Sequence, residues 1–370
     1  MSVLSHKSPQ GNALSVISIK KSEAYFSFAN KWSTVVILVG ILAIIGSFIW
    51  WLNMPLIEDM FTSSTITLIM VLGFQLYMGN SGILNWSYVG YIGIGAFASA
   101  IFSMDPDVKA LQLPTMYPFL VDLHLPFPLA LIGGALFATL IAAIVAWPLM
   151  RLSDSVGAIT QFALLIVFNV ILSQWSEVTN GPRTFTLGHS RQTTLWAALV
   201  VAIFVIAAVY YYKESSLGLK LRATRDDRYA ARSSGINLVA TRYVGYVISA
   251  FIGGFAGGLF SHYILSITAA SFYMQELFVV LSMLVIGGTM SVSGAFFGTL
   301  VVTLARQGLR QVELGLTKSG FEASGTTEIV LAIFMIIFLI WRPRGITGGS
   351  ELSWSSITKL CRRVFRRGSN

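Results

Sequence analysis

The chain has 370 residues, of which 55% are hydrophobic and only 11% are charged. A soluble globular domain carries roughly 25% charged residues, so this composition excludes a water-soluble protein. The 33 glycines and 10 prolines lie within apolar stretches rather than in polar low-complexity tracts, which excludes a disordered or collagen-like chain. The sequence therefore predicts an integral membrane protein.

The formal net charge of +9 would suggest a nucleic-acid partner in a soluble protein, but its distribution argues against one. Lys and Arg concentrate at both ends of the chain and in the internal stretch 213–242, as the positive-inside rule predicts for cytoplasmic segments. Cys361 is the only cysteine, so an intramolecular disulfide is impossible. We expect membrane lipid as a partner and no nucleic acid.

Continuous apolar runs predict the transmembrane helices. Residues 1–32 are largely polar and precede a run of the roughly 20 residues that cross a bilayer, so we expect a cytoplasmic N-terminal extension rather than a cleaved signal. Seven runs are interpreted directly as helices: about 33–52, 62–79, 83–103, 127–150, 156–175, 195–212 and 243–266.

The stretch 271–310 is too long for one span. As a single helix it would measure roughly 60 Å, twice the hydrocarbon thickness of a bilayer, so it must break. Gly287 and Gly288 supply the break, which leaves segments near 271–288 and 293–310, and a last span follows at 326–341.

The positions of the basic residues test this arrangement. Ten spans with an internal N-terminus place the seven basic residues of 213–242 and the seven of 342–370 in the cytoplasm, whereas nine spans would put the second group outside. We therefore expect an all-α integral membrane protein of about ten transmembrane helices, with a broken pair near 271–310 and both termini cytoplasmic.

The chain lacks the sequence motifs of common enzymes. It contains no P-loop pattern, paired cysteine cluster or zincin-type histidine pair, so we expect neither an ATPase site nor a metal site, and no cofactor. Ionisable residues within the apolar runs are few, chiefly Glu276, Glu328, Arg306 and Arg310. Ion-coupled carriers usually retain acidic or histidine relays at membrane depth, so this scarcity disfavours such a carrier. An ion-coupled transporter or a channel acting alone remains the alternative function.

The loop 213–242 is the most informative segment. Helix-forming residues from about 221 to 233 precede Gly235, which stands where a left-handed cap would end a helix, so the pattern predicts a short amphipathic surface helix. Two interpretations fit this pattern. The loop is either a solvated basic segment that obeys the positive-inside rule or a docking helix for a partner protein.

The same loop, from Gly218 through Asn237, resembles the cytoplasmic coupling segment of the permease subunits of branched-chain amino-acid ABC importers, the LivM-type family. The similarity continues at 90–97, 179–182, 243–263, Gly287-Gly288 and 341–346, and it spans roughly residues 65–346. Several separated motifs in the right order make the resemblance specific.

This resemblance implies a permease subunit in the bacterial inner membrane, with its own transmembrane domain at 33–345, the coupling loop at 213–242 and a basic cytoplasmic tail at 346–370. The implied substrates are branched-chain amino acids, or urea and short amides. ATP would be bound by separate ABC ATPase subunits. A homologous second permease subunit and a periplasmic or external solute-binding protein, docking near 104–126, 176–194 and 311–325, would complete the transporter.

The resemblance also implies which residues would contact the ATPase. These coupling residues are Arg222, Arg225, Asp226, Asp227, Arg228, Ala230, Ala231 and Gly235.

Polar residues beside glycines at membrane depth must face protein or water rather than lipid, which makes them candidates for the translocation pathway. The third predicted span opens with such residues, and Gly93 and Gly95 are expected to interrupt its helix. The full set of pathway candidates is Asn85, Ser87, Tyr88, Gly93, Gly95, Gln161, Asn169, Gly253, Gly257, Glu276, Gly287 and Gly288.

Two positions depart from the family pattern. Similar permeases typically carry Ser-Leu-Gly-His where this chain has Asn85 to Tyr88, and they often have Glu where it has Val279, with Glu276 one turn earlier. The departure at Asn85 to Tyr88 leaves open which of the implied substrates this chain carries.

Two other features have competing interpretations. The glycines at 253, 254, 257 and 258 form small-xxx-small pairs that permit close helix packing, with a moving gate as the alternative. We expect His262 to be an interfacial or hydrogen-bonded residue rather than a metal ligand.

Overall fold

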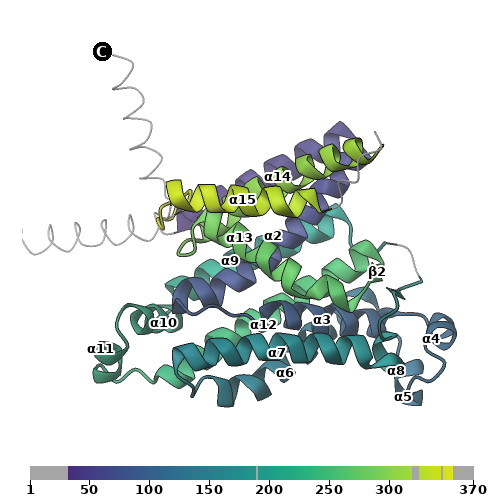
Figure 1. The fold of residues 1–370 in the computed structure, drawn as a ribbon, viewed down its shortest axis with the longest axis horizontal. Coiled ribbons are helices and arrows are strands. Elements are labelled where there is room, and N and C mark those ends of the chain that lie inside the picture. Colours follow the sequence, from purple (N-terminus) through teal and green to yellow (C-terminus); the bar gives the residue numbers. More distant parts are fainter. Residues whose placement is uncertain (1–31, 189–190, 319–324, 343–344, 353–370) are drawn as a thin grey trace, which may run out of the picture.

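The computed structural model describes residues 32–188, 191–318, 325–342 and 345–352. Nearly all of the expected N-terminal extension, and the basic tail after residue 352, lie outside the described residues. The described chain is almost wholly helical (Figure 1).

The long helices are Trp32–Leu52, α2 (Pro55–Ser81), α3 (Tyr88–Ser103), α6 (Phe127–Leu149), α7 (Asp154–Gln174), α9 (Leu195–Glu214), α12 (Leu238–Ile264), α13 (Met274–Gly287), α14 (Val292–Lys318) and α15 (Thr326–Trp341). The short ones are α4 (Pro106–Gln112), α5 (Pro118–Val121), α8 (Ser176–Thr179), α10 (Ser216–Asp226), α11 (Arg228–Ser233) and the 3-10 turn η1 (Ala269–Phe272). Strand β1 (Phe185–Thr186) pairs antiparallel with β2 (Ser266–Ile267).

Each of the ten apolar runs predicted from the sequence contains a helix. Eight of the described helices are long and apolar enough to cross a membrane, and α3 with α4, bent by 120°, would make a ninth. The helix α15 contains a shorter apolar segment, Ile329–Trp341. The prediction of an all-α multi-pass membrane protein is therefore confirmed.

Local sequence signals set several helix boundaries. Prolines stand in the first turn of α2, α4, α5 and α6, where the missing N–H costs no hydrogen bond. The side chain of Asn237 accepts a hydrogen bond from the N–H of Ala240 (3.1 Å) and begins α12. Gly82, in the left-handed region at φ 71°, ends α2.

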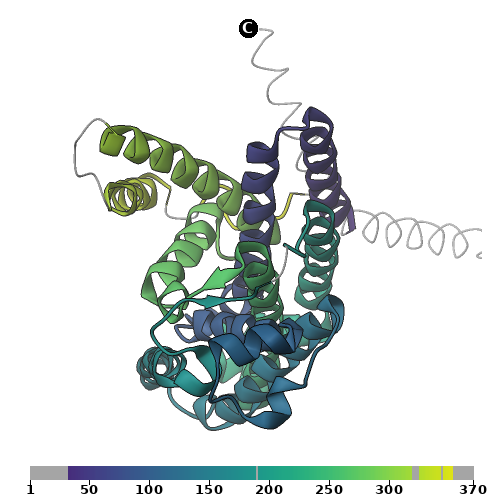
Figure 2. The ribbon, with the colours of Figure 1, turned by 90° about the vertical axis from the view of Figure 1, so that its right-hand side faces the viewer.

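The core of the bundle is built around α12, which contacts α2, α3 and α6. Glycines allow the backbones to touch. A Cβ at Gly95 of α3 would lie 2.3 Å from the Cα of Gly254 in α12, and a Cβ at Gly254 would lie 2.7 Å from the Cβ of Ala138 in α6. Small residues at these crossings permit close packing of membrane helices. Helices α14 and α15 lie on the opposite side of the molecule from α6 and α7 (Figure 2).

Two expectations about single spans need correction. Gly93 and Gly95 do not interrupt α3, which is continuous from Tyr88 to Ser103, because both glycines are used for packing against neighbouring segments. The third span also begins later than residue 83, since 82–87 form a turn before α3.

The break between α13 and α14 falls at Gly288, as predicted. The helix that follows runs to Lys318, well beyond the predicted end near residue 310.

The short helices mark the two ends of the bundle. Helices α10 and α11 lie at one end, and α4, α5 and α8 lie at the other (Figure 1). We call these the coupling end and the far end. Which of them faces the cytoplasm stays a prediction from the charge distribution.

Candidate functional site

The coupling loop forms two helices, so the prediction of one continuous helix over 221–233 is wrong. The break falls at Asp227, which has an extended backbone (φ −153°, ψ 113°). Its Oδ1 accepts hydrogen bonds from the N–H groups of Tyr229 (2.8 Å) and Ala230 (3.0 Å). An aspartate that caps a new helix in this way competes with continuation of the preceding one.

The end of α11 matches the prediction. Gly235 has a left-handed φ of 78°, and its N–H donates to the carbonyl of Arg232 (3.0 Å). The next N–H, of Ile236, donates to the carbonyl of Ala231 (3.1 Å). This pair of bonds is the Schellman motif, which confirms Gly235 as the cap.

Three of the residues predicted to contact an ATPase turn inward. Arg222 Nη2 donates to the carbonyl oxygen of Lys213 (2.9 Å), and Arg225 Nη1 donates to that of Gly79 in α2 (2.8 Å). Ala231 is buried at 4% exposure. These side chains hold the loop against the bundle.

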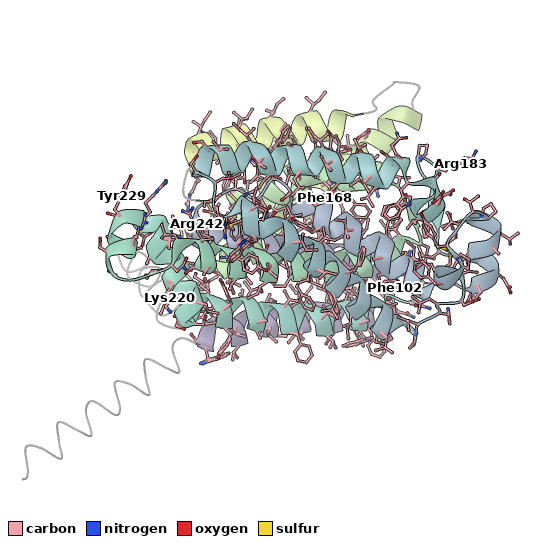
Figure 3. The ribbon with its side chains drawn as sticks, turned by 90° about the horizontal axis from the view of Figure 1, so that it is seen from below. Phe102, Phe168, Arg183, Lys220, Tyr229 and Arg242 are labelled. Carbon is pink, nitrogen blue, oxygen red and sulfur yellow. The ribbon has the colours of Figure 1, made fainter. Side chains whose placement is uncertain are left out.

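Asp226, Arg228 and Ala230 are exposed and form the outer face of the loop. Tyr229, which lies between Arg228 and Ala230, is a large aromatic residue and is 80% exposed. Figure 3 places Tyr229 at the tip of the coupling end, opposite Arg183 at the far end. We call the exposed residues 226, 228, 229 and 230 the coupling surface.

Tyr229 was not singled out in the sequence. The available signal was an aromatic residue inside a short, charged helix. Tyrosine is one of the residue types that most often anchor protein interfaces.

A buried hydroxyl cluster joins α3, α12 and the turn before α3. Ser87 Oγ lies 2.6 Å from the hydroxyl of Tyr246 and donates to Asn85 Oδ1 (3.0 Å). The Tyr91 hydroxyl lies 3.1 Å from that of Tyr246. All four side chains are completely buried. Asn85, Ser87, Tyr91 and Tyr246 form what we call the Tyr246 cluster.

Several buried amide groups are incompletely satisfied. Among the described residues, both amide atoms of Gln75, the Nδ2 of Asn85 and the Oε1 of Gln161 are buried without a hydrogen-bond partner. Buried polar atoms normally pair with protein or ordered water. They therefore mark places where water or a polar solute could bind. The sequence prediction included Asn85 and Gln161 but missed Gln75, Tyr91 and Tyr246.

Three other pathway candidates, Tyr88, Asn169 and Glu276, lie outside the Tyr246 cluster and interact with other parts of the bundle. The Tyr88 hydroxyl donates to the Met70 carbonyl (2.7 Å), and Asn169 Nδ2 donates to the Ala269 carbonyl (3.1 Å). Glu276 forms an ion pair with Arg306 (3.8 Å).

The candidate glycines lie where neighbouring segments pack closely against them. A Cβ at Gly253 would lie 2.9 Å from the ring of Tyr88, and one at Gly257 would lie 2.0 Å from the carbonyl oxygen of Ile92. Gly93 faces Phe272 in the same way, at 2.8 Å.

In the broken pair, a Cβ at Gly287 would lie 1.9 Å from the carbonyl oxygen of Gly294, so α13 and α14 also touch through their backbones. Its neighbour Gly288 has φ 119°, in the region that only glycine adopts freely.

His262 is buried and hydrogen-bonded. Its Nε2 lies 2.6 Å from Ser103 Oγ, and its Nδ1 lies 2.7 Å from the carbonyl oxygen of Gly258. Phe127 packs against its ring with the centroids 5.1 Å apart. The described residues include no group of three or more His, Cys, Asp or Glu side chains that could hold a metal ion.

A family model decides the classification of the chain. The model described as "Branched-chain amino acid transport system / permease component" matches residues 56–340, which is most of the chain. The chain belongs to this permease family.

Individual relatives of this permease are distant. It is 23% identical to the high-affinity branched-chain amino acid transport system permease protein LivM of Salmonella typhimurium, over 78% of this chain and 69% of that protein. It is 21% identical to the probable permease protein LivH of Methanocaldococcus jannaschii, over 82% and 95% of the two chains. It is also 25% identical to the nucleoside ABC transporter permease protein NupC of Lactococcus lactis, over 70% and 86%. No solved structure matches it.

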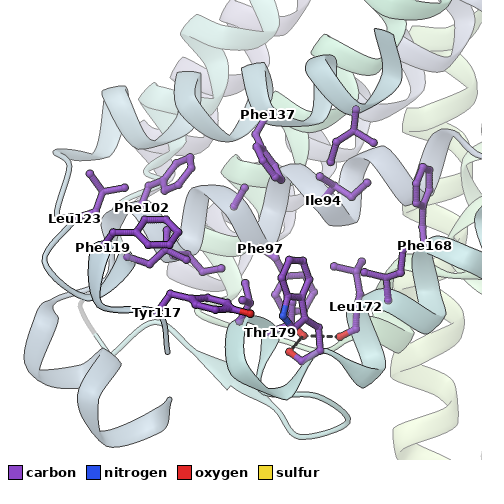
Figure 4. Close-up of a pocket in the computed structure, with 17 residues that line it drawn as sticks. Ile94, Phe97, Phe102, Tyr117, Phe119, Leu123, Phe137, Phe168, Leu172 and Thr179 are labelled. Atoms are coloured by element: carbon purple, nitrogen blue, oxygen red, sulfur yellow. Dashed lines mark hydrogen bonds between the residues drawn. The ribbon is translucent and has the colours of Figure 1, made fainter. Parts of the chain in front are cut away.

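The permease also contains an apolar cavity of about 590 Å³ near the far end, between α3, α5, α6, α7 and α8 (Figure 4). Phe97, Phe137 and Phe168 are among its walls. The hydroxyl of Thr179 at its edge lies 2.8 Å from two carbonyl oxygens of the chain itself, those of Leu172 and Trp175, and is engaged there. A polar solute in this cavity would lose water without gaining partners, so the cavity is unsuited to hold one.

Proposed function

We propose that this chain is the transmembrane permease subunit of a bacterial ABC importer in the inner membrane. It would translocate a small polar solute, powered by ATP hydrolysis in separate ATPase subunits, and would need no cofactor of its own. A homologous second permease subunit and an external solute-binding protein would complete the transporter. Family membership supports this function, since the relatives are permease proteins of such systems.

The coupling surface is the observation that carries the proposal. A short helix capped at both ends projects from the bundle and exposes a tyrosine at its tip, with Asp226 and Arg228 beside it. An aromatic anchor flanked by charges of both signs suits a docked interface, because the aromatic ring supplies buried area and the charges set orientation. In the proposed importer the ATPase subunit receives this surface.

Branched-chain amino acids are the proposed substrates, with urea or short amides as alternatives. The LivM and LivH relatives support the amino acids, while NupC shows that a relative of this chain is named for nucleosides. The unpaired amide of Gln75 and the unpaired Nδ2 of Asn85 offer both donors and an acceptor, which suits a solute with polar groups of both kinds.

The test is the affinity of the purified permease for its ATPase subunit. Replacing Tyr229 with Ala should weaken binding about 30-fold or more, since an interface hot spot is worth at least about 2 kcal/mol. The matched control is Tyr117→Ala, which removes a 42% exposed tyrosine at the far end and should leave the affinity unchanged.

Two results would contradict the proposal. Equal affinities for the two variants would show that α11 is not the docking surface. Solute uptake into vesicles that runs on an ion gradient without ATP would instead establish the ion-coupled carrier.

A further inference from the structure

The segment 345–352, beyond the part of the chain that the family model matches, returns from α15 and binds across the break between α13 and α14. We call it the C-terminal strap. Its first residues pair with the end of α13: the N–H of Ile346 donates to the carbonyl of Ile286 (2.9 Å), and that of Thr347 to the carbonyl of Gly287 (3.1 Å). The last carbonyls of a helix have no partner within it, so the strap satisfies groups that the break leaves open.

Glu351, near the end of the strap, binds the other side of the break. Its carboxylate accepts hydrogen bonds from the N–H groups of Val292 (2.8 Å) and Ser293 (3.1 Å) and from the Ser293 hydroxyl (2.9 Å). These N–H groups begin α14, where a helix favours negative charge. One strap therefore pairs with open backbone groups of both helices at the break.

The same carboxylate forms an ion pair with Lys213, a residue 138 positions away in the sequence. The pair is largely shielded from solvent, with side-chain exposures of 5% for Lys213 and 17% for Glu351. Lys213 Nζ also donates to the carbonyl of Met290 within the break (2.8 Å). Separating the two side chains would leave shielded charges without their partner at a cost in free energy, which favours their moving together.

Lys213 stands at the corner where α9 leads into the coupling loop. Ser215, two residues later, caps the first turn of α10. Arg222 of α10 donates to the carbonyl of Lys213 itself (2.9 Å). A displacement of α10 is therefore carried directly to Lys213.

A second contact joins the coupling loop to the break through α2. Arg225 donates to the carbonyl of Gly79, and a Cβ at Gly79 would lie 2.3 Å from the carbonyl oxygen of Thr289. The break is thus held from one side by the strap with Lys213 and from the other by α2 with Arg225.

We propose that Glu351 is a positioning residue for transport: through Lys213 it links motion of the coupling loop to the break between α13 and α14. The inference rests on the proposed function, because it assigns a path for force that an ATPase would apply to the coupling surface. The break moves with α10 as long as the ion pair and the strap hold. Without them, the ATPase moves α10 and the break no longer follows.

The test uses the full transporter, reconstituted in vesicles with its ATPase subunits and binding protein, and measures ATP hydrolysed per solute taken up. Glu351→Gln keeps an oxygen that can accept from the start of α14 but removes the charge, and Lys213→Met keeps the aliphatic chain. Each should raise the ratio of ATP to solute by about tenfold or more, the factor that corresponds to 1.4 kcal/mol. The double variant should raise the ratio of ATP to solute no further than the more affected single variant, since both single variants remove the same ion pair.

Glu313→Gln is the matched control. Its carboxylate accepts from the N–H groups of Gly325 (3.0 Å) and Thr327 (3.3 Å) near the other end of α14, away from the break. This variant should keep the wild-type ratio.

The outcomes separate this inference from the proposed function. A wild-type complex that shows no ATP-driven uptake refutes the proposed function. A wild-type complex that transports, with Glu351 and Lys213 variants that keep its ratio of ATP to solute, refutes the inference alone. A parallel loss of hydrolysis and uptake also refutes the inference, because it shows a structural role only.

Discussion

The crossing of α12 over α3 offers a direct test of how the bundle is held together. Gly257→Ala would place a methyl group 2.0 Å from the carbonyl oxygen of Ile92. Restoring an ordinary contact of 3.4 Å requires the two helices to separate by about 1.4 Å. The obstacle is backbone, which cannot rotate away as a flexible side chain can.

The energetic cost follows from this geometry. Overpacking a close contact costs about 1–3 kcal/mol, and a clash with backbone belongs at the upper end. A gap opened along the crossing also loses dispersion contacts of the neighbouring residues. Alanine gains about 1 kcal/mol in helix propensity over glycine, so we expect a net loss of about 2 kcal/mol in the free energy of unfolding.

The assay is unfolding of the purified permease in mixed micelles by increasing fractions of sodium dodecyl sulfate. The matched control is Gly157→Ala in α7, where nothing lies within 4 Å of the added methyl group, and it should be neutral or stabilising. Equal unfolding midpoints for the two variants would refute the close-packing argument. Loss of transport by Gly257→Ala at unchanged stability would instead support the moving gate.

Two further predictions concern local structure. Asp227→Ala should destabilise α11 by about 1 kcal/mol because it removes the cap, and faster amide hydrogen exchange over 228–233 would show it, whereas Asp227→Asn should behave like the wild type. Burial lowers the pKa of Lys109 below its ordinary value of 10.5, against the opposing pull of the carboxylates of Asp105 and Asp122. Between the lowered pKa and 10.5 the unfolded chain binds more protons than the folded one, so stability should rise with pH in that window. Thermal midpoints at increasing alkaline pH should show this rise in the wild type and lose it in Lys109→Met.

The sequence correctly predicted the structural features that depend on a single short stretch of the chain. The ten apolar runs, the break at Gly287 and Gly288, and the cap at Gly235 are each encoded within a few neighbouring residues, and the structure confirms them. Their physical basis is local: hydrophobic length, glycine conformational freedom and hydrogen bonds between adjacent turns.

The local predictions that failed did so for identifiable reasons. Asp227 has the side chain of a good N-cap, and that preference outweighed the helix-forming residues around it. Gly93 and Gly95 are poor helix formers, yet α3 is continuous because their lack of side chains lets neighbouring segments pack against it.

Two sets of site residues could not be sorted from sequence. Arg222 and Arg225 look like an exposed basic face, but both turn inward to carbonyl groups of the bundle. Tyr246 lies within an apolar run, and its hydroxyl meets that of Tyr91 only because α12 packs on α3. The rotation of each helix and its packing against its neighbours decide such contacts, and the sequence of a single helix does not predict either of them.

The sequence by itself determined that this chain is a multi-pass membrane protein of a transporter family, because apolar length, charge distribution and short motifs are properties of the linear chain. Only the tertiary structure decided which residues of the coupling loop face outward, which polar groups gather around Tyr246, and that Glu351 reaches Lys213 across 138 positions. The physical reason is that these pairings depend on how separate helices meet. Once buried, a charge or a hydrogen-bonding group is costly unless it is paired, so it binds the nearest complementary group.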